Sequence, residues 1–244
     1  MYFKCLTSLS IFGLLSAARD SRPEERIIGG HAILIEHVPW QVSLLRKTSH
    51  ICGGAILSDR VILTAGHCLE NENLEDLSIR AGSSLLKKGG QVVKVLKAIP
   101  HEKYVFQTAP FDIAVLILES PLKFNSRVQK IDIADETPPV GNMTLVTGWG
   151  CTRYNTSFSW PILQGVHVAV IDCGDQGSDV ICADTRRGTA CQGDSGGPLV
   201  RLTDFKLIGI VSLGTDVHEE GRGRYVNTVS LIDWISSTVT ENIG

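Results

Sequence analysis

The apolar residues of this chain fall in short runs rich in Val, Ile and Leu, and clusters of Gly, Pro, Asn and Asp separate them. Examples of these runs are 40–45, 55–57, 61–64, 91–96, 113–118 and 207–211. Short apolar runs bounded by turn residues are typical of β-strands, so the pattern predicts an all-β protein. The exception is 230–239, where apolar residues recur at helical spacing and predict one terminal α-helix. Its expected apolar face is Leu231, Trp234, Ile235 and Val239.

The first 18 residues have a different character. One early charge, Lys4, precedes an apolar stretch over 5–15 and a small-residue end at 16–18. This is the pattern of a secretory signal peptide, and the apolar stretch is too short to span a bilayer. We therefore predict a signal peptide over 1–18 and a secreted, extracellular protein with no membrane partner.

Charge and composition narrow the possible partners. The formal net charge is −3 with both signs spread along the chain, which gives no basic surface for nucleic acid or acidic membranes. There are no repeats or low-complexity tracts. A polar, proline-bearing stretch over 121–141 is the predicted domain boundary, because such composition marks linkers.

Three motifs carry candidate chemistry: TAGHC at 64–68, FDIAVL at 111–116 and GDSGGP at 193–198. They supply His67, Asp112 and Ser195. A serine hydroxyl is a poor nucleophile near pH 7, so it needs a base within hydrogen-bond reach, and the base needs an acceptor that fixes its tautomer. The three motifs contain one residue for each role.

These motifs, in this order, are accompanied by IIGG at 27–30, PWQVSL at 39–44, GWG at 148–150 and IDWI at 232–235. Together they make the chain from Ile27 to Gly244 resemble the chymotrypsin/trypsin family of secreted serine endopeptidases. The resemblance implies a protease domain over 27–244, made of two packed six-stranded antiparallel β-barrels with a C-terminal α-helix. It places His67 and Asp112 in the first barrel and Ser195 in the second.

The resemblance also implies a role for each site residue. Ser195 would attack the peptide bond, His67 would take its proton, and Asp112 would orient the His67 ring. The backbone N–H groups of Gly193 and Ser195 would form the oxyanion hole. Protein or peptide substrates, protein protease inhibitors, a monomeric state and no cofactor follow from the same resemblance.

Activation by cleavage is implied as well. The segment 19–26 resembles a short propeptide that ends at Arg26, so the expected activator is a trypsin-like protease. In the family, the freed amino group, here on Ile27, pairs with the carboxylate before the nucleophile, here Asp194. Because a buried carboxylate without a partner is costly, the cut can act as a switch.

The residues that match the family's substrate pocket are Thr189, Ser212, Gly214 and Gly223. Thr189 at the pocket base has no charge, so a buried Lys or Arg side chain would lack a counter-charge and trypsin-like specificity is disfavoured. An open pocket with a neutral base favours large apolar residues, although Leu213 replaces the usual tryptophan. The alternative is a preference for acidic residues, because a shift of one residue would direct Arg222 or Arg224 into the pocket.

Six cysteines remain after Cys5 leaves with the signal peptide, an even number that suits an oxidising compartment. The resemblance pairs Cys52 with Cys68 and Cys173 with Cys182. Cys191 lacks its usual family partner and Cys151 is left over, so the expected pair is Cys151 with Cys191, and two free thiols are the alternative. Thr144 and Arg201 occupy the two positions of another common family bridge.

No metal site is expected. No two cysteines have the spacing of a zinc motif, and Ser83 and Ser84 stand where the family's calcium loop needs an acidic residue. Asn142 and Asn155 begin glycosylation sequons, which matter only in a secreted chain. The remaining alternative function is a binding protein that keeps the fold but cleaves little, and reaction with a fluorophosphonate probe would distinguish the two.

Overall fold

The computed structural model describes residues 29–105, 111–151, 159–186, 188–212 and 221–243. The predicted signal peptide and propeptide, Arg26, Ile27, Asn155, Leu213 and Gly214 lie outside these ranges. Among the described residues, no helix has the length and apolar character needed to cross a membrane.

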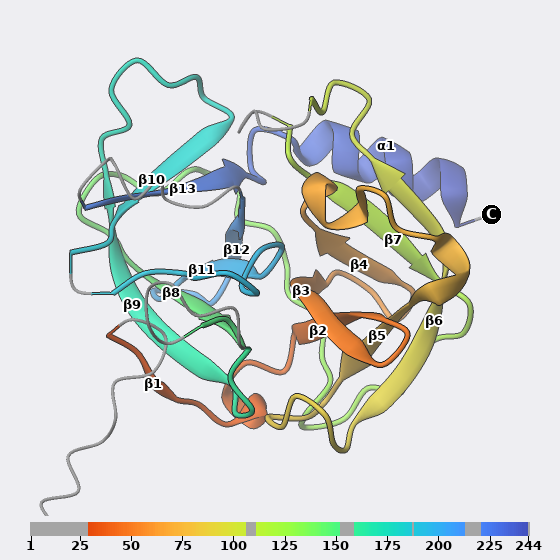
Figure 1. Ribbon diagram of the computed structural model, residues 1–244. Helices are drawn as coiled ribbons and strands as arrows, with labels where there is room; N and C mark the ends of the chain where they lie inside the picture. The colour runs from red at the N-terminus through yellow and green to blue at the C-terminus, as the bar shows by residue number, and fades with distance from the viewer. Residues whose placement is uncertain (1–28, 106–110, 152–158, 187, 213–220, 244) are drawn as a thin grey trace, which may run out of the picture.

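Six antiparallel strands close the first barrel in the order β2-β3-β4-β7-β6-β5 (Figure 1). They are β2 (Gln41–Arg46), β3 (Ser49–Ile56), β4 (Val61–Thr64), β5 (Leu77–Ala81), β6 (Gln91–Pro100) and β7 (Ala114–Leu118). Three short 3-10 helices lie between or before these strands: η1 (Ile35–His37), η2 (Gly66–Leu69) and η3 (Leu74–Asp76). Strands β4 and β7 are buried along their whole length, which explains why their sequences are continuous apolar runs.

The second barrel lies beside the first (Figure 1). Its strands are β8 (Met143–Gly148), β9 (Gln164–Ile171), β10 (Val180–Asp184), β11 (Pro198–Arg201), β12 (Leu207–Val211) and β13 (Arg222–Asn227). They are ordered β9-β10-β13-β12-β11-β8, and β8 also pairs with β9, which closes the ring. A two-residue strand, β1 (His31–Ala32), adds to β9. The predicted all-β architecture of two barrels is confirmed.

Helix α1 (Ile232–Asn242) follows the second barrel but packs against the first, near β7 and β6 (Figure 1). It starts and ends a few residues later than the predicted 230–239. Ile235 is buried and Trp234 is partly buried, as the helical spacing predicts. The Trp234 indole N–H donates to Glu102 Oε2 at 2.8 Å, so the helix also has a polar connection to the first barrel.

The segment 121–141 runs between β7, the last strand of the first barrel, and β8, the first strand of the second. Arg201 anchors one part of it. The Arg201 guanidinium lies 2.7 Å from Asp204 and 3.3 Å from Asp135, and these contacts raise its pKa. Arg201 is the cross-strand partner of Thr144. The buried Arg201 guanidinium and its more exposed carboxylate partners therefore form an ion cluster at the two positions that the sequence analysis matched to a family disulfide.

Candidate active site

His67 and Asp112 form the centre of the site. His67 lies in η2, directly after β4, and Asp112 lies just before β7. The Asp112 carboxylate is fully buried, accepts from His67 Nδ1 at 2.7 Å and accepts the His67 backbone N–H at 2.8 Å. Because Nδ1 faces the carboxylate, Nε2 is the ring nitrogen left to accept a proton. The structure therefore brings together His67 and Asp112, the two residues that the sequence analysis expected to act as base and orienting group.

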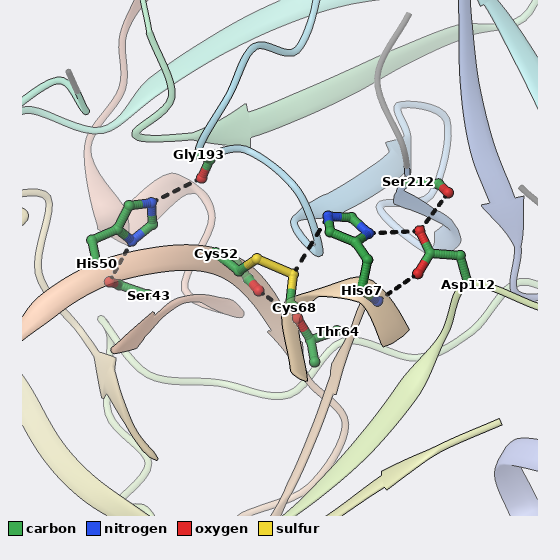
Figure 2. The surroundings of a disulfide bond; sticks show 10 residues. Ser43, His50, Cys52, Thr64, His67, Cys68, Asp112, Gly193 and Ser212 are labelled. Carbon is green, nitrogen blue, oxygen red and sulfur yellow. Dashed lines mark hydrogen bonds and ion pairs between the residues drawn. A yellow bond between two sulfur atoms is a disulfide. The ribbon is translucent and has the colours of Figure 1, made fainter. Parts of the chain in front are cut away.

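A third donor to Asp112 comes from the second barrel. The Ser212 hydroxyl, just after β12, donates to Asp112 Oδ2 at 2.6 Å (Figure 2). The sequence suggested a pocket position for Ser212 but gave no signal that its hydroxyl contacts the aspartate. The carboxylate therefore has donors from both barrels, which fixes its orientation.

The backbone before Asp112 has an unusual conformation. Phe111 has a φ of 62°, in the left-handed region that is costly for a bulky residue. Its ring stacks on His101 with 4.7 Å between ring centroids, and His101 also packs on Trp234 at 4.5 Å. Burial lowers the pKa of His101. This aromatic stack supports the turn that presents Asp112, and the apolar pattern of the sequence did not reveal it.

The turn that carries Ser195 packs against the first barrel. Gly53 N–H, in β3, donates to the Ser195 carbonyl at 2.7 Å. A Cβ added at Gly196, whose φ is 76°, would collide with the side chain of Thr64 and come within 3.0 Å of the Ala65 backbone nitrogen. Ala65 precedes His67 by two residues. The close contact explains why glycine follows Ser195 and places the serine turn beside the histidine segment.

Gly193 is held by a residue that the sequence analysis missed. His50 Nε2 donates to the Gly193 carbonyl at 2.8 Å, and the Ser43 hydroxyl is 2.8 Å from His50 Nδ1 (Figure 2). Burial lowers the pKa of His50 to about 4, so the ring is neutral near pH 7. A carbonyl only accepts, so Nε2 carries the proton and Nδ1 accepts from Ser43. His50 thereby fixes the peptide between Gly193 and Asp194, which adjoins the Gly193 N–H.

We expect His50→Phe to reduce kcat by about tenfold to a hundredfold and to change KM less, because losing the hydrogen bond to the Gly193 carbonyl would loosen the residue whose N–H is the expected oxyanion donor. Phe keeps an aromatic ring beside Trp149, which His50 contacts edge-on at 5.9 Å. Ser43→Ala, which leaves the contact with Gly193 intact, is the milder control. Steady-state kinetics on a peptide p-nitroanilide measures both constants. An unchanged kcat in a folded His50→Phe protein contradicts the positioning role.

Asp194 is fully buried next to the same turn. Its carboxylate accepts backbone N–H groups from Gly150 at 2.7 Å and from Cys191 at 2.9 Å. Burial raises its pKa to about 6 despite these two donors. A Cβ at Gly148 or at Gly150 would collide with the carboxylate. The GWG motif therefore supplies glycines where only backbone fits.

Thr189 and Tyr225 are buried with hydroxyls that have no hydrogen-bond partner in the described part of the chain. A Cβ at Gly223 would lie 3.3 Å from the Tyr225 hydroxyl, so Gly223 and Tyr225 share one face of β13. Arg222 and Arg224 alternate with these residues along the strand, so their side chains extend from the opposite face of β13. The Arg222 guanidinium donates to the Cys173 carbonyl at 3.3 Å.

The six described cysteines form three disulfides: Cys52–Cys68, Cys151–Cys191 and Cys173–Cys182. The Cys52–Cys68 bridge lies beside His67 (Figure 2). These sulfurs and the His67 ring are close enough to resemble a metal-binding group. Because the sulfurs are joined to each other, they are not the thiolates that bind zinc.

The chain has two closed barrels. A histidine and an aspartate come from the first barrel and a serine turn from the second, which is the arrangement of the two-barrel class of hydrolases. The family model named Trypsin matches residues 27–235. Similar curated proteins include trypsin delta of Drosophila erecta, 43% identical with 86% of this chain and 87% of the relative covered. Hypodermin-A of Hypoderma lineatum is 41% identical with 80% of each covered. The chain belongs to the trypsin family and is a serine endopeptidase.

A solved structure gives the same result for the fold. Neuropsin, a serine protease expressed in the limbic system of mouse brain, superposes with a TM-score of 0.77 at 28% identity. The match covers 86% of this chain and 98% of neuropsin.

Proposed function

We propose that this serine endopeptidase is secreted as a zymogen and, after a cut behind Arg26, cleaves proteins through Ser195, His67 and Asp112. The observation that carries the proposal is the buried Asp112 carboxylate with donors from His67 and Ser212, beside the docked serine turn. The same proposal includes the signal peptide 1–18, the propeptide 19–26 and the domain 27–244. The active chain is a monomer that acts on protein or peptide substrates and is inhibited by protein protease inhibitors.

In the proposed reaction, Ser195 Oγ attacks the carbonyl carbon of the substrate while His67 Nε2 takes the hydroxyl proton. The Gly193 and Ser195 N–H groups stabilise the negative oxygen of the tetrahedral intermediate. His67 then gives its proton to the leaving amine, and the C–N bond breaks to leave an acyl-enzyme. Water, deprotonated by His67, attacks this ester, and Ser195 regains its proton as the acid product leaves.

Activation uses the buried Asp194 carboxylate. Its raised pKa shows that burial penalises the anion more than two N–H donors offset. An ammonium group on Ile27, created by the cut, supplies the missing positive charge. We therefore infer that cleavage makes the ionised form of Asp194 favourable and orders the adjacent Gly193.

The pocket favours a large apolar residue on the acyl side of the cut bond. Membership of the trypsin family does not by itself bring a preference for Lys or Arg, because Thr189 offers a hydroxyl and no charge. Burying an aromatic ring contributes about 1.5 to 3 kcal/mol, whereas a buried cation there would lack a counter-charge. The placement of Arg222 and Arg224 on the opposite face from Gly223 argues against the acidic alternative.

We expect the activated enzyme to cleave after Phe, Tyr, Leu or Met when a peptide library varies the acyl-side residue. Thr189→Asp should shift the preference toward Lys and Arg, because a carboxylate at the pocket base supplies the missing charge. Thr189→Ser is the matched control and should keep the apolar preference. Cleavage by the unmodified enzyme mainly after Asp, Glu, Lys or Arg contradicts the apolar pocket.

A further inference from the structure

The Cys151–Cys191 disulfide lies at the two segments that hold the Asp194 carboxylate. Cys191 is itself one of the two backbone donors, and Cys151 directly follows the other donor, Gly150. The bridge therefore joins the two donor segments through cysteines that are 40 residues apart in sequence.

A backbone contact strengthens this connection. Cys151 is buried, and its N–H donates to the Gln192 carbonyl at 3.0 Å. Gln192 is followed by Gly193, whose carbonyl accepts from His50. The covalent bond and the hydrogen bond together attach the segment 191–193 to Cys151, the residue directly after GWG.

From this arrangement we propose that the Cys151–Cys191 bridge keeps the two N–H groups that donate to Asp194 together before activation. The turn 193–195 is then partly ordered in the uncut chain. Ordering two separate segments around a carboxylate costs conformational entropy, and a cross-link reduces that cost by restricting the disordered alternatives. The Ile27 ammonium group then completes an arrangement that the bridge has begun. The bridge is a positioning element and takes no part in the chemistry.

This inference rests on the proposed function, because it assumes that a cut behind Arg26 activates the protein. If the proposal is correct, loss of the bridge has unequal effects on the uncut and the cut chain. Removing the bridge should harm the uncut chain more than the cut chain, in which the ammonium group also holds Asp194. A bridge that only stabilised the fold would affect both forms alike.

The test combines two changes in four proteins: bridged or Cys151→Ala/Cys191→Ala, each either cut or kept uncut by Arg26→Gln. The rate of Ser195 labelling by a fluorophosphonate is measured in each. We expect bridge removal to slow labelling about tenfold more in the uncut form than in the cut form, a coupling of the size found between contacting groups. Cys173→Ala/Cys182→Ala removes the other bridge of the second barrel and should show no such difference. Equal slowing of both forms overturns the proposal.

Hydrogen–deuterium exchange provides a readout that does not depend on activity. In uncut Ser195→Ala protein, bridge removal should speed exchange of the amides in 191–195 about tenfold, with little change in β4 or β12. Unchanged exchange in 191–195 overturns the proposal. If the alanine pair does not fold, the folded, bridged protein is reduced, alkylated and measured in the same way. If the cut, bridged protein does not label at Ser195, the proposed function fails while the exchange result still decides the role of the bridge.

Discussion

Replacing Ser195 by alanine should reduce peptide hydrolysis by about a millionfold and abolish fluorophosphonate labelling, because the hydroxyl is the attacking group. His67→Ala should cause a loss of similar size. Since the two residues act in one proton transfer, the double variant should be little worse than either single variant. Stopped assays with a peptide ester and a peptide amide measure these losses.

Folding must be unchanged for this result to bear on catalysis. Neither substitution removes a buried apolar side chain, so the circular dichroism spectrum and the thermal midpoint should stay close to those of the unmodified protein. Ser212→Ala is a useful comparison, because it removes a donor to Asp112 without touching the nucleophile and should cost far less activity. Full turnover by purified Ser195→Ala protein would refute the assignment.

Arg26→Gln should leave the chain uncut and slow probe labelling at least about a hundredfold, the size expected when an oxyanion donor is lost. The physical reason is that no ammonium group exists at Ile27 to pair with Asp194. N-terminal sequencing verifies that the protein is uncut. Asp194→Asn should weaken the cut form in the same way, because an amide cannot form the ion pair. Equal activity of the cut chain and the verified uncut chain excludes the switch.

The same carboxylate gives the uncut chain a pH dependence. The folded pKa of Asp194, about 6, lies above its ordinary value of 3.8. Its stabilising contribution is therefore full below about pH 4 and is lost as the pH rises through 6, on the order of 3 kcal/mol. The lowered pKa of His50 makes stability change with pH in the opposite direction. The uncut protein is therefore compared with its Asp194→Asn variant, in which the His50 contribution is the same. Urea unfolding should therefore show that the unfolding free energy of the uncut protein, measured relative to the Asp194→Asn variant, falls by about 1 kcal/mol between pH 5 and pH 7, because part of the loss has already occurred below pH 5.

The sequence predicted the architecture because apolar runs and turn residues are local signals. Strands β4 and β12 have the predicted bounds, 61–64 and 207–211, because they are continuous apolar runs. Strands such as β10 and β13 were not predicted. In β13 an arginine stands on each side of Gly223. The strand therefore lacks an apolar run at its start, although Gly223 and Tyr225 are buried.

The candidate site was predicted to the extent that it lies in short motifs. His67, Asp112 and Ser195 could be named from the sequence, whereas His50 and the hydroxyl contact of Ser212 could not. His50 reaches Gly193 across 143 positions of sequence, and Ser212 reaches Asp112 across 100. Contacts of this kind depend on how the two barrels pack, which no local pattern encodes.

The ion cluster around Arg201 changes which conditions weaken this part of the second barrel. A disulfide between β8 and β11 would respond to reductants and be indifferent to salt. Arg201 responds in the opposite way, because its contacts with Asp135 and Asp204 need ionised carboxylates and are screened by dissolved ions. Low pH or a high salt concentration, rather than a thiol reagent, is therefore the condition that weakens the connection between β11 and the segment 121–141.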